Sequence, residues 1–196
     1  MPTLHIFVVT AYPPLETARL LLHPLELADA DQIQRKFPHP EIVRFLHDNV
    51  PWPYPPDGAL SYIEKLALPA IREGRAWHWT IRRKELPSDV IGLVSLMRQP
   101  DDNRGFWLVP EWQGQGLMRE ASDAATDYWF GPLGEAVLRV PKATANIASR
   151  AISAGSGMRV IWTGERDYVS GRHPAELWEI TSDEWASRLR TNQPRM

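Results

Sequence analysis

The chain has 196 residues, of which 43% are hydrophobic, so it can bury the core of one ordinary domain. Its 22 basic and 24 acidic residues leave a net charge of −2, which argues against a general electrostatic hold on nucleic acid or on an anionic membrane. The sequence has no cysteine, which excludes disulfides, thiolate metal sites and a cysteine nucleophile. We therefore expect a single domain over residues 1–196 with no nucleic-acid or membrane partner.

The N-terminal segment contains a short apolar run, Ile6 to Val9. The run is too short to span a membrane and lacks a basic start, so it predicts neither an anchor nor a signal peptide. We expect residues 1–14 to form an extra edge strand or a flexible segment. The protein is expected in the cytoplasm, as a monomer or a homodimer.

The first half of the chain predicts strands and helices in mixed order. The expected strands cover Arg19 to Leu25, Trp77 to Ile81, which alternates as a half-buried strand, and Val90 to Met97. The expected helices cover Ala28 to Phe37, Pro40 to Leu46, and a stretch from an Asp57 N-cap to about Arg72 with a kink at Pro69. Residues 82–89 are expected to form a hairpin-like loop, and Asp101 with Asp102 a solvated hairpin tip.

The second half continues this mixture. The expected strands cover Gly105 to Val109, Ala136 to Val140, Arg159 to Trp162 and Leu177 to Ile180. The expected helices begin at Leu117, at about Asn146 with a C-cap at Gly155 or Gly157, and at a cap formed by Ser182 or Asp183. The pattern predicts an α+β fold with a central mixed, mostly antiparallel sheet flanked by helices.

The most informative stretch joins a strand, a glycine-bearing turn and a helix start between Gly105 and Ala121. Gly114 and Gly116 permit a tight turn, and the helix start offers about four unpaired N–H groups, an arrangement that suits a pyrophosphate. A Walker loop is excluded because its lysine and its serine or threonine are missing after the last glycine. A dinucleotide fingerprint is excluded because Arg119 stands in place of its third glycine.

The turn resembles motif A of the GNAT acetyltransferase superfamily, which wraps the pyrophosphate of acetyl-CoA. Gln113 and Gly116 match that motif, whereas Met118 departs from its small third residue. Further stretches resemble the Rim-type branch, which acetylates the amino termini of ribosomal proteins, so that the likeness covers roughly residues 17–190. They are the first strand from Thr17 to Leu25 with the helix entry at Ala28 to Ala30, the substrate-side loop from Trp52 to Pro55, motif B from Asn146 to Ser149, and the last two strands at Arg166 to Tyr168 and Leu177 to Thr181.

The resemblance implies a GNAT-type acyl-CoA N-acyltransferase fold, acetyl-CoA as co-substrate and an amine-bearing acceptor. In this fold the strands before and after the turn helix run parallel and splay apart to admit the cofactor. The implied cofactor-binding residues are Trp107, Leu108, Val109, Gln113, Gly114, Gln115, Gly116, Leu117, Met118, Arg119 and Asn146. The backbone N–H groups of Leu108 and Val109 are expected to pair with pantetheine and polarise the thioester carbonyl. Arg119 is expected either to reach a phosphate or to point into solvent.

Acetyl transfer to an amine also needs a proton acceptor and a donor for the leaving thiolate. Motif B contains no tyrosine, so Ser149 is the candidate donor, unless its hydroxyl only bonds the helix backbone. Asn146 is expected to bond a pantetheine amide, to N-cap the helix, or both. His78, on the strand face opposite its neighbouring tryptophans, is the candidate base. Other candidates are His47, Glu41 and Glu111, or no side chain at all if water carries the proton.

Trp52 and Tyr54 are held in a proline-rich loop, where they either line an acceptor pocket or pack against the body of the protein. The six histidines have no pair at metal-ligand spacing, so no zinc site is expected. The sequence thus predicts an acetyl-CoA-dependent N-acetyltransferase that acetylates a protein N-terminus or a small-molecule amine by direct attack in a ternary complex. The alternatives are a non-catalytic acyl-CoA-binding sensor or interaction module, and a protein that lost the cofactor because Met118 fills the phosphate site.

Overall fold

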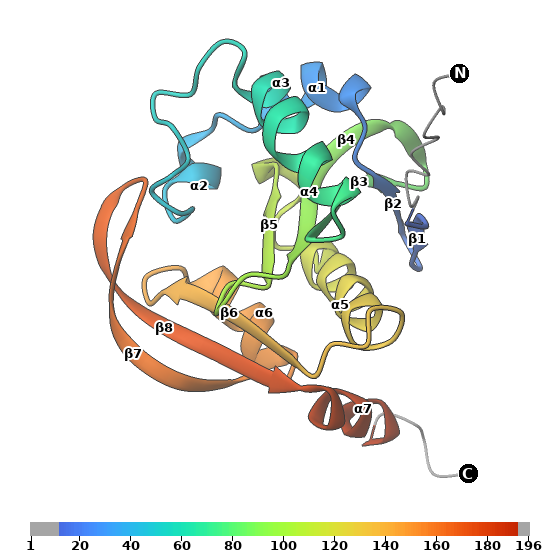
Figure 1. Cartoon of the computed structure of the whole chain (residues 1–196), viewed down its shortest axis with the longest axis vertical. Helices are drawn as coiled ribbons and strands as arrows, with labels where there is room; N and C mark the ends of the chain where they lie inside the picture. Colours follow the sequence, from blue (N-terminus) through green and yellow to red (C-terminus); the bar gives the residue numbers. More distant parts are fainter. Residues whose placement is uncertain (1–11, 192–196) are drawn as a thin grey trace, which may run out of the picture.

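The computed structural model of the protein describes residues 12–191, without the side chains of residues 189–191 (Figure 1). The strands are β1 Leu15–Glu16, β2 Leu20–Pro24, β3 Ala76–Arg83, β4 Leu86–Met97, β5 Arg104–Leu108, β6 Val137–Ala143, β7 Arg159–Tyr168 and β8 Gly171–Thr181. The helices are α1 Ala30–Lys36, α2 Pro40–Val43, α3 Gly58–Tyr62, α4 Leu68–Arg72, α5 Leu117–Phe130, α6 Ile147–Gly155 and α7 Ser182–Thr191. Short helical turns add η1 Leu27–Asp29, η2 Ile63–Ala67 and η3 Pro110–Trp112. The run from Ile6 to Val9 lies outside the described residues.

The strands form two antiparallel sheets, in the orders β1-β2-β3-β4-β5 and β6-β8-β7. The predicted α+β class and the mostly antiparallel pairing are therefore confirmed. The long β7–β8 hairpin curves away from the body of the second sheet and rises toward the segment after α2 (Figure 1). There the N–H of Val169 donates to the carbonyl of Leu46 at 3.0 Å. This contact closes one wall of the space between the sheets.

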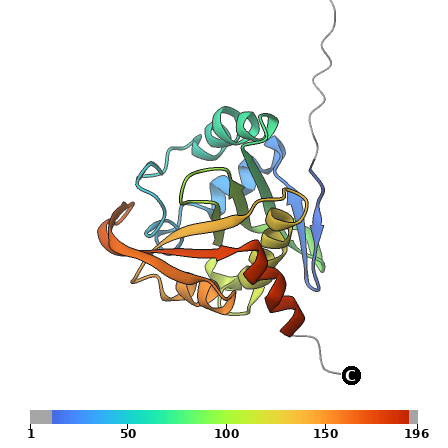
Figure 2. The ribbon, with the colours of Figure 1, turned by 60° about the horizontal axis from the view of Figure 1, so that its bottom comes forward.

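Strand β3 is buried on both faces, whereas its alternating sequence predicts a half-buried strand. Trp79 packs against Tyr128 of α5 with ring centres 5.2 Å apart. His78 points to the opposite face, as expected, where its ring lies 6.1 Å from that of Tyr62. Helices α3 and α4 lie over one face of the first sheet and α5 over the other (Figures 1 and 2), so His78 faces a helical layer and not solvent.

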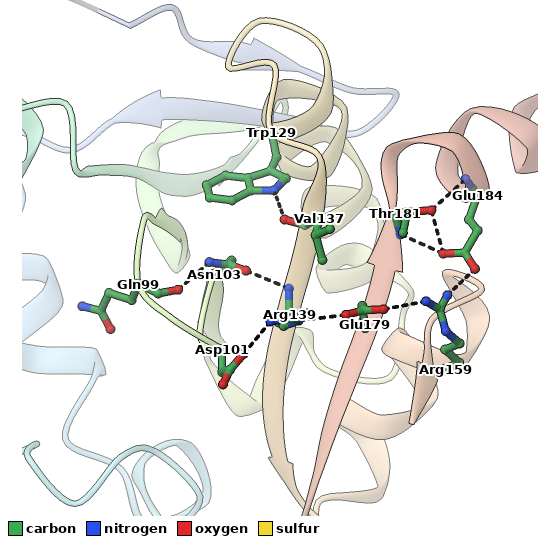
Figure 3. Close-up of polar contacts among 10 residues, drawn as sticks. All are labelled: Gln99, Asp101, Asn103, Trp129, Val137, Arg139, Arg159, Glu179, Thr181 and Glu184. Atoms are coloured by element: carbon green, nitrogen blue, oxygen red, sulfur yellow. Dashed lines mark hydrogen bonds and ion pairs between the residues drawn. The ribbon is translucent and has the colours of Figure 1, made fainter. Parts of the chain in front are cut away.

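The two sheets meet at one polar junction, where β5 and β6 begin (Figure 3). The backbone N–H of Asn103 donates to the carbonyl of Arg139 at 2.7 Å, and the N–H of Arg139 donates to the Asn103 side chain at 2.8 Å. The Arg139 guanidinium also bridges Asp101 at 3.0 Å and Glu179 at 2.8 Å. Asp101 is therefore part of this junction, and is not the solvated tip that the sequence predicts.

Beyond this junction β5 and β6 are not paired, and a gap opens between them. The sequence predicts a strand that ends at Val140, directly before a proline. The strand instead runs through Pro141, which pairs with Leu177 of β8, to Ala143. Hydrogen bonds at both ends of β6 join even-numbered residues to β8. The backbone N–H groups of the odd-numbered residues therefore point away from β8. The missing N–H of Pro141 therefore faces the gap and leaves the ladder intact.

Three boundaries differ from the sequence prediction for local reasons. The loop expected over residues 82–89 is shorter because β3 and β4 extend into it. The last helix is capped one residue earlier than expected, because Thr181 accepts from the N–H of Glu184 while the Glu184 carboxylate accepts from the N–H of Thr181. Helix α6 ends in a Schellman turn at Gly157, with a φ of 79°, so the second of the two expected glycines is the capping residue.

Candidate active site

The glycine turn presents a run of free backbone donors. Gly114 and Gly116 have positive φ values of 73° and 78°, and Gly116 is the N-cap of α5. The first hydrogen bond of the helix runs from the N–H of Glu120 to the carbonyl of Gly116. Within residues 12–191 the N–H groups from Gly114 to Arg119 donate no hydrogen bond. A run of free N–H groups at the positive end of a 14-residue helix is an anion-binding arrangement.

Arg19 and Glu120 hold this turn against the start of β2. Glu120 accepts from the backbone N–H of Arg19 at 2.8 Å, from its guanidinium at 2.7 Å and from the hydroxyl of Thr17 at 2.5 Å. Burial by itself would raise the pKa of Glu120, but these bonds outweigh it and lower the pKa. Arg19 also donates to the carbonyl of Gln115 at 3.0 Å. The turn is therefore fixed before any ligand arrives.

The side chains of the turn point away from its free N–H groups. Met118 is only 8% exposed and packs in the hydrophobic core beside Leu117. The alternative of a protein that lost its cofactor requires Met118 to fill the phosphate position. Met118 does not do so, because its side chain is buried in the core. Gln113 donates to the carbonyl of Leu108 at 2.8 Å and so ties the turn to the end of β5. Arg119 reaches across to the carbonyl of Gly155 at the end of α6.

The edge of β5 corrects one expectation about the backbone. The N–H of Val109 donates to the carbonyl of Ile91 at 2.9 Å, so it is engaged with β4 and does not face a cofactor. Hydrogen-bonded pairs alternate along an antiparallel ladder, and Gly92 and Leu108 form the next pair. The N–H of Leu108 therefore points away from β4 and toward β6. Of the two expected donors, only Leu108 faces the gap.

The gap continues into a cavity of about 1380 Å³. Its walls come from β5, β6, the start of α6, the segment between α2 and α3, and the tip of the β7–β8 hairpin. Its lining includes Trp107, Lys142, Asn146, Ser149, His78 and Asp102. The structure thus brings together Trp107 and the motif B residues, whereas the glycine turn lies outside this cavity.

Asn146 and Ser149 lie at the start of α6, beside a buried lysine that the sequence did not single out. The Asn146 carbonyl oxygen caps the helix by accepting from the N–H of Ser149 at 3.2 Å, which leaves its amide NH₂ for a ligand. The Ser149 hydroxyl does not bond the helix backbone. It accepts from Nζ of Lys142 at 2.6 Å, and its own proton has no acceptor within residues 12–191.

His78 lines the cavity as a buried imidazole, only 2% exposed. Its Nδ1 is bonded to the hydroxyl of Ser95 at 2.7 Å. Burial lowers the pKa of His78 to about 4. The ring is therefore neutral at neutral pH but takes up a proton poorly, which weakens its case as the base.

Asp102 lies at the cavity wall and is half-buried. Burial raises the pKa of its carboxyl, and the charges of His47, Lys142 and Arg166 oppose that shift in part. Within the described residues it forms neither an ion pair nor a hydrogen bond. Sequence reasoning placed Asp102 in a solvated tip because the approach of β7 to this loop is not visible along the chain.

The two residues of the proline-rich loop have different surroundings. Tyr54 lines the cavity and packs against Phe37 with ring centres 5.0 Å apart, and burial raises the pKa of its phenol to about 12. Trp52 is 45% exposed and does not line the cavity. Over residues 12–191, no helix is both long and apolar enough to cross a membrane, and no cluster of three metal-ligating side chains occurs.

The model of the acetyltransferase (GNAT) domain family matches residues 19–159, so the chain belongs to this family. It is accordingly an acetyl-CoA-dependent N-acetyltransferase with the GNAT fold. Three similar proteins sharpen the comparison. The FsC-acetyl coenzyme A-N(2)-transacetylase of Aspergillus fumigatus is 27% identical over 96% of this chain and 83% of its own length.

Two solved structures share the fold. A ribosomal-protein alanine acetyltransferase from Vibrio fischeri superimposes with a TM-score of 0.74 at 18% identity, over 89% of this chain and 99% of its own. The coenzyme A complex of a ribosomal α-N-protein acetyltransferase superimposes with a TM-score of 0.75 at 15% identity, over 88% and 99%. Both agree with the predicted GNAT-type fold.

Proposed function

We propose that this chain is a single-domain enzyme that transfers the acetyl group of acetyl-CoA to a primary amine by direct attack in a ternary complex. The observation that carries the proposal is the pairing of two features on either side of the β5 end. One is the run of free N–H groups from Gly114 to Arg119, and the other is the lined gap between β5 and β6. The first suits the pyrophosphate, and the second suits the pantetheine arm and the thioester.

In this proposal the edge of β5 and the start of α6 bind the arm. The N–H of Leu108 faces the gap from β5 and polarises the acetyl carbonyl. The amide NH₂ of Asn146 donates to a pantetheine carbonyl from the start of α6. No covalent intermediate with the enzyme is needed, because both partners of the transfer reach the same cavity.

Two side chains carry the protons. Asp102 takes the proton from the attacking amine, since it is a carboxylate on the cavity wall that no cation of the described residues pairs with, and burial raises its pKa. Ser149 gives its free hydroxyl proton to the sulfur as the carbon–sulfur bond breaks. The geometry of Asp102 and Ser149 on one cavity supports this division of roles.

The acceptor is proposed to be a protein amino terminus or a small-molecule amine. The name of the Aspergillus relative specifies an N(2) position, and the Vibrio fischeri enzyme acts on a ribosomal-protein alanine. A wide cavity with Tyr54 on its wall can admit either kind of acceptor.

The test is release of the CoA thiol from acetyl-CoA with three acceptors: alanine-initiated and serine-initiated peptides, amino-acid amides, and spermidine. We expect turnover with at least one of them that is lost on N-acetylation of the acceptor. Binding of acetyl-CoA without thiol release from any acceptor would contradict the transfer and favour a non-catalytic acyl-CoA-binding module.

A further inference from the structure

Lys142 is a buried amine in the gap between the sheets. It lies on the same face of β6 as the buried Leu138 and Val140, and only 5% of it is exposed. Its Nζ donates to the hydroxyl of Ser149 at 2.6 Å and lies 5.1 Å from the ring centre of Phe106 on β5. Three elements, β5, β6 and α6, therefore surround this single ammonium group.

The carboxylate opposite Lys142 in the sheet does not form an ion pair with it. Glu176 is directly opposite Lys142 across β6 and β8, so both side chains stand on one face of the sheet. The Glu176 carboxylate is engaged by both ends of the Arg150 guanidinium at 2.9 Å and by the indole of Trp178 at 2.9 Å. Within residues 12–191 Lys142 has no ion pair.

The charged groups around Lys142 come from each neighbouring element. Arg104 of β5 faces it with a like charge, and Asp102 in the loop before β5 faces it with an opposite charge. On α6 and β8 the charges of Arg150 and Glu176 cancel each other. Burial first, and then Arg104, lower the pKa of Lys142 to about 7, and Asp102 opposes this shift. An unpaired buried lysine is costly, so a role at the site explains its presence better than packing does.

We infer that Lys142 is a positioning residue that acts through Ser149, supplying the positive charge and the replacement proton for the departing CoA thiolate. This inference rests on the proposed function. Its ligand chemistry is a thiolate, which a nearby ammonium stabilises. The Ser149 hydroxyl accepts from Lys142, so its own proton is directed to another acceptor in the cavity.

The step balances in protons and electrons. The nitrogen of the neutral acceptor forms the new bond to the acetyl carbon, and the electron pair of the carbon–sulfur bond goes to sulfur. Sulfur takes the Ser149 proton, and Ser149 takes a proton from Lys142, which becomes neutral. Asp102 holds the proton lost by the acceptor nitrogen, and exchange with water through the shared cavity returns both groups to their starting states.

This role has a defined pH signature. The relay needs the ammonium form, which is lost as the pH rises through the pKa of about 7. Since kcat/KM reports groups of the free enzyme, kcat/KM should fall on the alkaline side of about pH 7. A permanently charged side chain at position 142 should remove that fall.

The experiment measures kcat/KM against pH for the unaltered enzyme, Lys142→Met and Lys142→Arg, with acetyl-CoA and the acceptor of highest rate in the panel above. Lys142→Met should lower kcat about 30-fold with acetyl-CoA affinity kept within about 3-fold. Lys142→Arg should recover part of the rate and remove the alkaline fall. The matched control is Lys65→Met, because Lys65 lines the same cavity and also bonds a serine hydroxyl, that of Ser61 at 3.3 Å. Lys65→Met should leave the position of the alkaline fall unchanged.

A second readout needs no acceptor. Calorimetric titration should show tighter binding of CoA than of desulfo-CoA, and this preference should vanish in Lys142→Met and persist in Lys142→Arg. The inference is overturned if the enzyme turns over but Lys142→Met keeps both the alkaline fall and the thiol preference. If the unaltered protein neither binds acetyl-CoA nor releases thiol, the proposed function itself has failed.

Discussion

The glycine turn and the gap cluster offer different kinds of group to the same cofactor. The turn, from Gly114 to Arg119, offers backbone N–H groups at the surface, while its side chains point to the core or across to α6. The gap cluster of Asn146, Ser149 and Lys142 offers side chains from two elements inside a cavity. Backbone donors tolerate changes of side chain that the gap cluster does not.

This difference explains why Met118 is compatible with cofactor binding. A side chain matters at the turn only if it occupies the space in front of the N–H groups, and Met118 packs behind them. In the gap, by contrast, each of the three side chains has one hydrogen-bond partner and keeps a further donor free. The following substitutions test the contrast, beginning with the largest expected effect.

Ser149→Ala should lower kcat by about 300-fold, within the range of general acid catalysis, and leave acetyl-CoA affinity within about 3-fold. Steady-state kinetics and calorimetry measure the two quantities. Ser153→Ala is the matched control, because Ser153 lies one turn further along α6 and its buried hydroxyl has no hydrogen-bond partner. Equal rates for Ser149→Ala and Ser153→Ala would remove Ser149 from the mechanism.

Asp102→Asn should lower kcat/KM by about 100-fold at neutral pH, because the amide cannot accept the acceptor's proton. The raised pKa of Asp102 implies that the unaltered enzyme loses activity as the pH falls through that pKa. Asp102→Asn should lack this loss of activity, because the asparagine side chain does not titrate. Asp101→Asn breaks only the ion pair with Arg139 and should change the rate less than about 3-fold. A pH profile unaltered by Asp102→Asn would rule out the assigned base.

Lys142→Met should stabilise the fold by about 2 kcal/mol at pH 6, since apolar replacement of a buried charge is often stabilising. The folded pKa of about 7 lies below the unfolded value of 10.5, so the unfolded chain binds more protons between these values. The free-energy cost of burying Lys142 in the folded protein therefore decreases as the pH rises from 7 to 10.5. Urea unfolding should show a gain for Lys142→Met that is smaller at pH 10 than at pH 6, and a gain independent of pH would contradict this account.

Glu120→Gln should destabilise the fold by roughly 1 kcal/mol at pH 7, an effect limited by the partial exposure of the pair with Arg19. The lowered pKa of Glu120 means that its contribution is present above the unfolded pKa and is lost as the pH falls through the folded one. The difference between the two proteins should therefore narrow in acid. Glu135→Gln, which breaks an ion pair with Arg98 away from the turn, serves as the comparison. A difference that persists in acid would show that the charge of Glu120 is not what holds the turn.

The turn could be predicted from the sequence because its chemistry is local. Gly114 and Gly116 favour positive φ values, and the start of the helix follows directly. The gap cluster could be predicted only in part. Asn146 and Ser149 lie in one helical turn, but Lys142 lies beyond Val140, where the predicted strand ends. A lysine in register with the buried Leu138 and Val140 was the available signal.

Other parts of the site were hidden because they depend on tertiary contacts. The N–H of Val109 is engaged because it donates to β4, and His78 is buried because α3 packs over it. Asp102 joins the cavity only because the β7–β8 hairpin bends back over it. Alternation within one strand shows which side chains share a face, but not what covers that face.

The most direct test of the account is calorimetric titration with acetyl-CoA of the unaltered protein, Gly114→Trp and Gly134→Trp. Gly114 and Gly134 both have positive φ, 73° and 66°, and open space where a Cβ would stand, so the two substitutions impose similar backbone strain. We predict that Gly114→Trp weakens binding at least about 100-fold, by covering the free N–H groups, and that Gly134→Trp leaves it intact. Equal binding by all three proteins would contradict the claim that the glycine turn holds the cofactor.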